Sequence, residues 1–381
     1  MHIGIDARPL ATPRSGIRRY TECLIRGLAR VDTENRYALC GAPRHADRGL
    51  ADLERELDPS RFQVHREPFP RARTVEYLWP VSVPRSVGLY HGTNYGAPWL
   101  LACPSVITVH DTTVQKFPAM HPWRRRLRHR LVPAQCRRAA RVIADSASTR
   151  DDVVAAFGVD ASRIAVVPLA ASEGMRPVTD GATLRELRER LRLPERFLFY
   201  AGALEPRKDL VSLFDALARL RAEGRKESLV LAGAGERSHR ILLDAALVRF
   251  GLEPGRDVHF VGAVSDGDLA ALYSSCVLFV YPSLYEGFGL PPIEAMACGA
   301  PVVATRTSAI AENFEDAAAL VAPGAPAQLA AVLARWLDDE SARAELATSG
   351  ARRARARSWD DVARETLAVY HDALWGNDWT H

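Results

Sequence analysis

The alternation of short apolar runs with longer helical segments is the feature that most constrains how this chain can fold. Residues 2–5 form an apolar run, residues 9–16 have the composition of a loop, and an amphipathic segment follows. The apolar face of that segment has three- and four-residue spacing and consists of Ile17, Tyr20, Leu24, Leu28 and Val31. Such alternation is typical of βα units that assemble into a parallel sheet.

The alternation occurs in two series. In the first series we predict strands at residues 2–5, 106–109, 142–144 and 164–167. In the second we predict strands at residues 197–200, 229–232, 258–261, 277–281 and 302–304, and a last helix over residues 359–374. Between the series, serine, glycine and proline in residues 170–183 break both periodicities, as in an exposed linker. The chain has 381 residues, of which 48% are hydrophobic, and this is enough to bury two cores. We therefore predict an α/β protein with two doubly wound parallel sheets.

Composition excludes several classes of protein. A formal net charge of +4 indicates no nucleic acid or other polyanion as a partner. The six cysteines are scattered without a C-x-x-C pair, so neither a disulfide framework nor a zinc site is predicted. No apolar run approaches the ~20 residues of a membrane span, and the first residues enter an apolar strand without the pattern of a signal peptide. We expect a cytoplasmic protein.

The strongest local signal lies in residues 281–299. An apolar strand runs into a loop with two glycines, and Pro291 and Pro292 then fix the backbone for a helix that begins there. Loop amides and a helix N-terminus together favour phosphate binding. Glu286 and Glu294 flank the turn, and carboxylates are good acceptors for vicinal hydroxyls, so a ribose or sugar beside a phosphate is expected. The alternative is that Glu294 complements the helix dipole and the glycines serve only a tight loop.

Two further signals follow predicted strands. Arg207 and Lys208 are adjacent cations at the carboxyl end of a strand, where open α/β sheets bind ligands, and they suit a diphosphate. His110 and Asp111 end the strand at residues 106–109. From across a cleft, His110 could bond a sugar hydroxyl or the acceptor. Taken singly, a surface pair of cations or a lone histidine is more often structural.

Two other motifs are interpreted as structural. Asp266-Gly-Asp268 matches the D-x-D of metal-dependent sugar transfer, but Ser265 or Asp266 is expected to cap a helix whose first turn holds Asp268. Residues 233–235 lack the third glycine of G-x-G-x-x-G, which disfavours a dinucleotide oxidoreductase.

Residues 123–141 carry eight arginines. The simpler interpretation is the solvent face of a helix, which Pro133 interrupts. The alternative hypothesis is that residues 124–130 make a peripheral contact with anionic lipid, near a lipid-linked acceptor at the inner face of the membrane.

As a set, these segments resemble glycosyltransferase family four, whose members are retaining enzymes of GT-B fold. Glu286 and Glu294 match its E-x7-E motif, residues 202–210 resemble its G-x-L-x-x-x-K-N segment with Asp209 in place of Asn, and residues 258–273 resemble its strand and "LAALY" helix. Residues 4–20 resemble the mannosyltransferase branch that builds bacterial polysaccharides, with Ser15-Gly16 where the branch usually has two glycines.

The resemblance implies two Rossmann-like domains that face each other across a cleft. Residues 1–172 would bind the acceptor, residues 173–358 would bind the nucleotide-sugar donor, and residues 359–381 would cross back to the first domain. Glu294 would hold the ribose, and Glu286 would hold the transferred sugar. Arg207 and Lys208, expected with His110 across the cleft from the two glutamates, would neutralise the departing diphosphate. The remaining donor contacts implied are Gly16, Gly202, Val264, Phe288, Gly289 and Leu290.

The implied activity is transfer of a hexose from a nucleotide sugar to a saccharide or lipid-linked saccharide, without a metal or other cofactor. GDP-mannose is the first expectation for the donor, on the branch resemblance alone. The alternatives are a UDP-sugar-dependent transferase, a sugar-nucleotide epimerase or phosphorylase of the same fold, and a non-catalytic sugar-nucleotide-binding partner.

Overall fold

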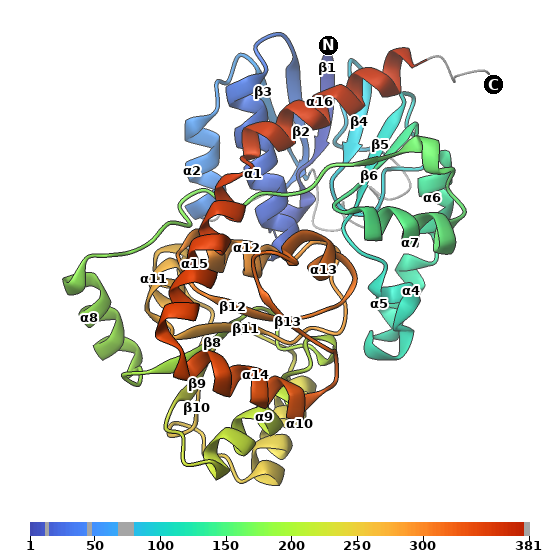
Figure 1. The fold of residues 1–381 in the computed structure, drawn as a ribbon. Coiled ribbons are helices and arrows are strands. Elements are labelled where there is room, and N and C mark those ends of the chain that lie inside the picture. The colour runs from blue at the N-terminus through green and yellow to red at the C-terminus, as the bar shows by residue number, and fades with distance from the viewer. Residues whose placement is uncertain (12–14, 44–47, 68–79, 377–381) are drawn as a thin grey trace. The chain divides into compact units, whose positions relative to one another are not determined.

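A computed structural model describes the chain except for residues 12–14, 44–47, 68–79 and 377–381. The chain divides into two compact units (Figure 1). Unit 1 comprises Met1–Leu169 together with Ser358–His381, and unit 2 comprises Ala170–Arg357. The helix after residue 357 thus belongs to the same unit as the first strand.

Unit 1 contains a seven-stranded parallel sheet in the order β3-β2-β1-β4-β5-β6-β7. The strands are β1 (His2–Asp6), β2 (Arg36–Ala42), β3 (Phe62–Arg66), β4 (Leu89–Gly92), β5 (Ser105–Val109), β6 (Arg141–Ala144) and β7 (Ile164–Val166). The α-helices are α1 (Gly16–Val31), α2 (Arg48–Glu56), α4 (Thr113–Lys116), α5 (Trp123–His129), α6 (Val132–Arg138), α7 (Ala147–Phe157) and α16 (Trp359–Trp375). Short 3-10 turns lie at Arg8–Ala11, Pro118–Met120 and Ala161–Arg163.

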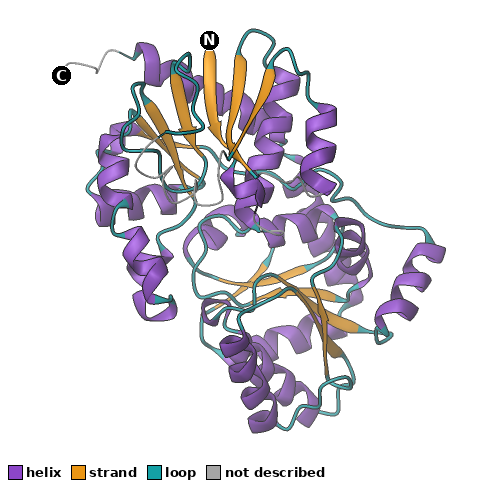
Figure 2. Cartoon of the chain, turned by 180° about the vertical axis from the view of Figure 1, so that it is seen from behind, coloured by secondary structure: helices purple, strands orange, loops and turns teal. Residues whose placement is uncertain are grey.

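Unit 2 repeats this plan with a six-stranded parallel sheet in the order β10-β9-β8-β11-β12-β13. The strands are β8 (Phe197–Ala201), β9 (Ser228–Ala232), β10 (Val258–Gly262), β11 (Leu278–Tyr281), β12 (Val302–Thr305) and β13 (Ala319–Val321). The helices are α8 (Gly181–Leu191), α9 (Leu210–Ala222), α10 (Arg237–Phe250), α11 (Asp266–Ser275), α12 (Leu290–Ala297), α13 (Ser308–Phe314), α14 (Pro326–Asp338) and α15 (Glu340–Arg355), with a 3-10 turn at Pro206–Lys208. In each unit helices lie on both faces of the sheet (Figure 2).

The predicted fold class is confirmed, since both sheets are parallel and doubly wound. Each predicted strand is present, with both ends within one residue of the predicted bounds. Four strands were not predicted: β2, β3, β4 and β13. β3 has the sequence Phe-Gln-Val-His-Arg and only its first residue is buried, because it lies at the edge of the sheet.

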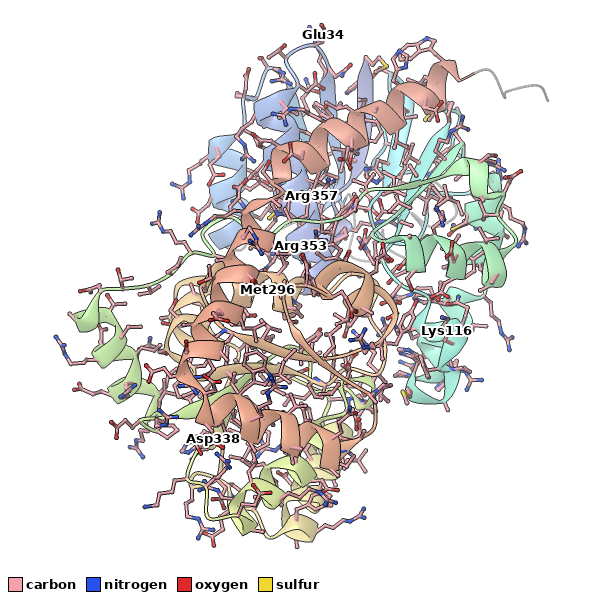
Figure 3. The ribbon with its side chains drawn as sticks, viewed as in Figure 1. Glu34, Lys116, Met296, Asp338, Arg353 and Arg357 are labelled. Atoms are coloured by element: carbon pink, nitrogen blue, oxygen red, sulfur yellow. The ribbon has the colours of Figure 1, made fainter. Side chains whose placement is uncertain are left out.

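Glycine allows two close helix contacts, one in each unit. A Cβ at Gly27 of α1 would lie 2.6 Å from the Trp359 carbonyl oxygen, so α16 packs directly on the backbone of α1. A Cβ at Gly350 of α15 would lie 2.9 Å from Cγ of Met296, a residue of α12 that Figure 3 labels. Contacts this short leave no space for a larger side chain at either glycine.

Candidate active site

The main polar cluster of unit 2 lies where the strand order reverses. β8 and β11 are neighbours in the sheet although two strands and three α-helices lie between them in sequence. The segment with Arg207 and Lys208 follows β8, and the segment with Glu286 follows β11. A hydrogen bond of 2.9 Å from the Leu284 amide to the Arg207 carbonyl joins the two loops. The crevice beyond the carboxyl ends at such a reversal is the usual ligand site of open α/β sheets.

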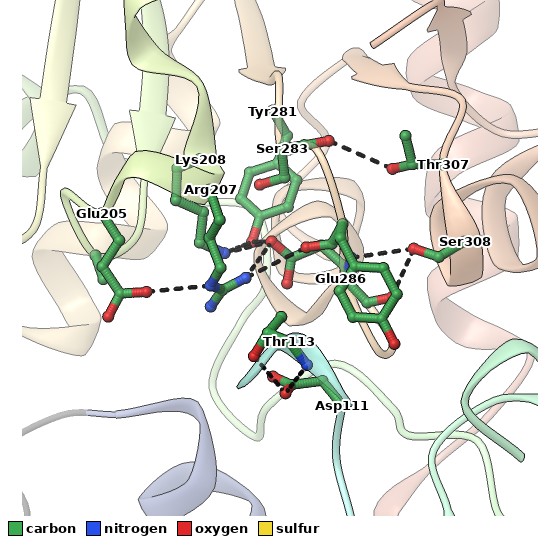
Figure 4. Close-up of polar contacts among 12 residues, drawn as sticks. Asp111, Thr113, Glu205, Arg207, Lys208, Tyr281, Ser283, Glu286, Thr307 and Ser308 are labelled. Atoms are coloured by element: carbon green, nitrogen blue, oxygen red, sulfur yellow. Dashed lines mark hydrogen bonds and ion pairs between the residues drawn. The ribbon is translucent and has the colours of Figure 1, made fainter. Parts of the chain in front are cut away.

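Three donors converge on one oxygen of the Glu286 carboxylate (Figure 4). Arg207 Nη1 donates to Glu286 Oε1 at 3.0 Å, Lys208 Nζ donates to the same oxygen, and the Tyr281 hydroxyl donates to it at 3.1 Å. Lys208 Nζ also donates to the Tyr281 hydroxyl at 2.6 Å, and Arg207 Nε donates to Glu205 Oε2 at 3.1 Å. The cluster of Arg207, Lys208 and Glu286 therefore carries two positive charges and one negative charge.

Burial and neighbouring charges both act on the pKa values of this cluster. Lys208 is 4% exposed and Glu286 is 8% exposed. Burial and the neighbouring Arg207 lower the pKa of Lys208 to about 8, against the attraction of Glu286. Burial raises the pKa of Glu286, but Lys208 and Arg207 more than offset this effect and lower it to about 2. At neutral pH both groups are charged.

The backbone of Glu286 is held by one side chain from the start of α13. Ser308 Oγ accepts a hydrogen bond from the Glu286 amide at 3.1 Å and donates one to the Glu286 carbonyl at 2.8 Å. Ser308 has φ 38°, a left-handed conformation that is unfavourable for a residue other than glycine. Just before Ser308 in the chain, the Thr305 and Thr307 hydroxyls both donate to the Ser283 carbonyl. The segment from the end of β12 to the start of α13 thus fixes the loop that carries Glu286.

The turn before α12 depends on Gly289, which caps the helix with φ 104°. A Cβ there would lie 2.6 Å from Ile310 Cδ1 and 2.8 Å from Phe314 Cε2, so both conformation and space require glycine. Asn313 Nδ2 donates to the Phe288 carbonyl at 3.1 Å. Leu290 is the first residue of α12, as the Pro-Pro pair predicted.

Glu294 is the fifth residue of α12 and is buried. Its Oε1 accepts a hydrogen bond of 2.5 Å from the Ser172 hydroxyl. The alternative in which Glu294 only complements the dipole of a first helical turn does not fit, since the residue lies in the second turn and has this specific partner.

His110 lies in unit 1, at the carboxyl end of β5. Its Nδ1 lies 2.7 Å from Asp145 Oδ2 and its Nε2 lies 2.9 Å from the Thr93 carbonyl oxygen. Both ring nitrogens thus lie within hydrogen-bond distance of a protein oxygen. Burial alone would lower the pKa of His110, but the Asp145 carboxylate reverses the effect and raises it. The ring stacks edge-on against Tyr20 and Tyr95, with centroid distances of 4.7 and 5.7 Å.

The expectation that Arg207 and Lys208 lie across a cleft from Glu286 is wrong. All three residues belong to unit 2 and are in direct contact. Loops that follow neighbouring parallel strands meet at one edge of the sheet, so opposite charges at the ends of β8 and β11 form ion pairs.

Two family models match the chain, one in each unit. "Glycosyltransferase Family 4" matches residues 14–171, and "Glycosyl transferases group 1" matches residues 185–353. The O-antigen chain mannosyltransferase B of Escherichia coli is 30% identical over 390 residues, which cover 97% of this chain and 99% of that protein. The chain belongs to glycosyltransferase family 4.

Other similar proteins agree with this assignment. The glycosyltransferase is 34% identical over 286 residues to the MMP alpha-(1->4)-mannosyltransferase of Mycolicibacterium hassiacum, covering 71% of this chain and 66% of that protein. Among solved structures, Anabaena HepE in complex with UDP and glucose is 21% identical with a TM-score of 0.74, covering 97% of this chain and 99% of that one. Sucrose-phosphate synthase from Thermosynechococcus elongatus is also 21% identical, with a TM-score of 0.75 and 98% of each chain covered. These two structures confirm the GT-B fold.

The remaining predicted contacts of the glycosyltransferase lie in loops next to the two sheets. Gly202 follows β8, and its amide donates to the Ala232 carbonyl at 3.0 Å. Val264 lies between β10 and α11, and Gly16 begins α1 directly after the capping residue Ser15. Their contacts with a donor stay predictions.

The interpretation of the D-x-D sequence as a helix start is confirmed. Ser265 caps α11 by accepting a hydrogen bond from the Asp268 amide. Asp268 in turn pairs with Arg190 at 2.6 Å. Among the described residues of the glycosyltransferase, no helix is long and apolar enough to span a membrane.

Four residues of the site were not singled out from the sequence: Ser172, Tyr281, Ser308 and Asp145. Their side chains are of common types, and each forms a hydrogen bond with a site residue that lies between 5 and 122 positions away in the sequence. Only Tyr281 had a local signal, since it lies in the same motif as Glu286.

Proposed function

We propose that the glycosyltransferase transfers mannose from GDP-mannose to a saccharide or lipid-linked saccharide acceptor, with retention of configuration and without a divalent metal. The mannosyltransferase names of the relatives from E. coli and M. hassiacum support the choice of sugar and the place of the reaction in polysaccharide or glycoconjugate synthesis. Units 1 and 2 would bind the acceptor and the donor respectively.

The observation that carries the proposal is the buried cluster of Arg207, Lys208 and Glu286 at the strand-order reversal of unit 2. These three residues together carry a net charge of +1, with the partly buried Glu205 as a further partner of Arg207, and they lie beside the N-terminus of α12 on the segment after β11. Fixed cations in a dry environment stabilise the charge that develops on a leaving diphosphate, and they require no reorganisation during the reaction. Such an arrangement can do the electrostatic work that a metal ion does in other transferases.

Within the cluster, each residue is assigned a role. Two of the three N–H donors of Lys208 are directed to Glu286 and Tyr281, among the residues that the structure describes, so one remains for a phosphate oxygen. The three donors to Glu286 share Oε1, and Oε2 is the oxygen that accepts from a hydroxyl of the transferred sugar. Glu294, oriented by Ser172, accepts from the ribose hydroxyls.

In the reaction, the bond between the anomeric carbon and the diphosphate oxygen breaks, and its electron pair moves to that oxygen. The acceptor hydroxyl forms the new bond on the same face of the sugar, and its proton passes to the departing phosphate. Arg207 and Lys208 stabilise the diphosphate throughout. Both ring nitrogens of His110 have protein partners, which hold the imidazole in one orientation, and Asp145 raises the pKa of the ring. A direct bond from His110 to a sugar hydroxyl would require the Thr93 contact to open.

Release of GDP from GDP-mannose, measured with and without a panel of saccharide acceptors, tests the proposal. We expect Arg207→Ala and Lys208→Ala each to lower turnover by about 10²–10³-fold, the usual effect of removing one group that stabilises a developing oxyanion. Arg219→Ala is the matched control, since Arg219 lies in the same unit in an exposed pair with Asp215. Unchanged turnover in both cluster variants, with the thermal unfolding of the wild type, contradicts the assignment.

Two further measurements separate the parts of the proposal. Glu294→Ala should raise the donor Kd more than it lowers the turnover of bound donor, because its partner is the ribose and not the reacting carbon. Full turnover in EDTA, and an α-linked product from the α-linked donor, are the outcomes expected for metal-independent retention. A strict metal requirement or an inverted product would refute those two points and leave the transferase assignment standing.

UDP-sugars are the second class of donor that an observation supports. The structure of HepE that resembles this chain contains UDP and glucose, and another contains UDP-glucose. A thermal-shift panel of GDP, UDP, ADP and their sugars distinguishes the two, since a ligand at 100-fold excess over Kd adds about 2.7 kcal/mol to stability. Stabilisation by UDP and not by GDP would replace the mannose donor by a UDP-sugar. Conversion of the nucleotide sugar without an acceptor would instead indicate an epimerase, and donor binding without turnover would indicate a non-catalytic partner.

A further inference from the structure

α5 and the two residues after its end carry an exposed apolar row. Trp123, Leu127 and Leu131 recur every four residues, and their exposed fractions are 66%, 54% and 49%. Four exposed arginines lie in the same stretch: Arg124, Arg126, Arg128 and Arg130. We call these seven residues the basic apolar face; it lies on the helix labelled α5 in Figure 1. Large apolar side chains grouped on a surface, with cations around them, mark interaction sites more often than single exposed residues do.

The side of α5 that packs on unit 1 is a different one. His129 is 7% exposed, and its ring lies 5.2 Å from that of Tyr95 between centroids. Burial and the adjacent arginines Arg125 and Arg128 lower the pKa of His129 to about 4, so the ring that anchors the helix is neutral. The apolar row is consequently not required for packing within the unit.

Among the described residues, the four arginines of the basic apolar face are uncompensated, although Lys116 and Arg141 nearby pair with Asp152 and Asp372. Between Asp111 and Asp145 the sequence contains nine lysines and arginines and no aspartate or glutamate. Over the described part of the chain, Arg124, Arg126, Arg128 and Arg130 have no carboxylate within ion-pair distance, whereas exposed arginines of unit 2 such as Arg190 and Arg306 pair with Asp268 and Glu315. Unpaired cations around an apolar row complement a surface that is both anionic and apolar beneath its charges.

We propose that the basic apolar face docks on an anionic lipid bilayer. Trp123, Leu127 and Leu131 insert at the boundary between headgroups and acyl chains, and the four arginines bind lipid phosphates. A nucleic acid would match the arginines, but its phosphates offer no apolar layer for three bulky side chains on one row. The interaction is independent of the donor, the acceptor and the reaction.

Flotation of the full chain with vesicles tests the proposal. Binding is expected to vesicles of phosphatidylcholine with 30% phosphatidylglycerol and not to phosphatidylcholine alone. One variant combines Arg124→Gln, Arg126→Gln and Arg128→Gln, and a second combines Trp123→Ser and Leu127→Ser. At about fivefold per cation near an anionic surface, the first should weaken partitioning by on the order of 100-fold. The second should weaken it at least tenfold without any change of charge.

The matched control removes three exposed arginines from unit 2, in Arg352→Gln, Arg353→Gln and Arg355→Gln at the end of α15. We expect this variant to bind vesicles within about threefold of the wild type, since α15 lacks the apolar row.

Equal loss of vesicle binding in the control variant would show that the effect depends only on net charge, and would overturn the proposal. Vesicle binding that persists in both the arginine variant and the Trp123 and Leu127 variant would also overturn the proposal. A DNA duplex bound with the same dependence on the arginines, but without dependence on Trp123 and Leu127, would assign the face to a polyanion instead. Thermal unfolding of each variant shows that the fold is intact, and GDP release in detergent-free buffer reports the reaction separately.

Discussion

Lys208 is the residue at which burial and charge oppose each other most directly. Burial and Arg207 disfavour its protonated form, and Glu286 favours it, with the result that its pKa falls to about 8 from its usual value near 10.5. A buried cation that titrates this close to neutrality is typical of functional sites. Because Glu286 stays ionised down to a pH of about 2, loss of the Lys208 proton takes the net charge of the cluster from +1 to 0.

The pH dependence of kcat/KM for the donor should show this titration. The quantity reports ionisations of the free enzyme, so we expect it to fall above pH 8, towards tenfold per pH unit. Lys208→Arg keeps the positive charge to above pH 12 and should shift the alkaline limb out of the measurable range, even where its overall activity is lower. An unchanged limb in Lys208→Arg would assign the ionisation to another group.

Ser308 holds both backbone polar groups of Glu286 while it adopts φ 38°. Ser308→Ala removes both hydrogen bonds and should lower the free energy of unfolding by about 1–3 kcal/mol. Ser308→Gly loses the same bonds but relieves the left-handed strain, so it should be more stable than the alanine variant by about 1 kcal/mol. We expect kcat/KM to fall about tenfold in both, because the carboxylate of Glu286 is no longer positioned. Activity that follows stability across the two variants would show that Ser308 has only a structural role.

At the scale of elements, the contact of α1 with α16 is decided by a single glycine. Alanine is the better helix former by about 1 kcal/mol, so propensity alone predicts that Gly27→Ala stabilises the protein. The position of the Trp359 carbonyl oxygen, 2.6 Å from the added Cβ, predicts the opposite. Sterics should prevail, since the contact is with backbone, which cannot rotate away.

We therefore expect Gly27→Ala to lower the free energy of unfolding by about 1–3 kcal/mol. Gly267→Ala in α11 is the same substitution in open space, where the nearest atom to the new Cβ is Ser265 Oγ at 4.0 Å, and it should be neutral or stabilising by up to about 1 kcal/mol. Urea unfolding of both variants measures the difference. Effects of the same sign and size would mean that the separation of α1 and α16 adjusts freely.

Local pattern was sufficient to predict most of the elements but not the contacts within the site. The strand, glycine loop and Pro-Pro helix start of residues 278–297 could be recognised because each depends on neighbours within a few positions. The ion pair between Lys208 and Glu286 spans 78 positions and follows from the adjacency of β8 and β11, which periodicity does not encode. For the same reason the partner of Glu294 was missed, because Ser172 lies in a segment that was interpreted only as linker.

At the scale of the whole molecule, the chain passes between the units twice, near residues 169 and 357. α16 returns to unit 1 and supplies the last link of a buried polar chain. Tyr370 Oη lies 2.6 Å from His91 Nδ1, His91 Nε2 lies 2.8 Å from Thr108 Oγ1, and Thr108 Oγ1 lies 3.0 Å from the Tyr20 hydroxyl. Burial lowers the pKa of His91 to about 3, so the chain is neutral at ordinary pH.

Removal of α16 by truncation after Arg357 should prevent unit 1 from folding, because it exposes the apolar face of α1 and leaves His91 Nδ1 without its partner. Tyr370→Phe removes only the hydroxyl and should lower the free energy of unfolding by about 1–3 kcal/mol. Near-UV circular dichroism and urea unfolding measure both effects. A truncated chain that unfolds like the wild type would show that α16 does not contribute to the core of unit 1.

The position of α16 also fixes an order of events during translation. Unit 2 is one continuous stretch, so all of its strands and helices have been synthesised before residue 358 is added. Unit 1 begins first, yet the helix that covers α1 and completes the His91 network emerges last. Domains of a nascent chain generally fold in the order in which they emerge. Here the first domain to begin is the last to be completed, and a chain released before residue 358 contains all of unit 2 but lacks the helix that completes unit 1.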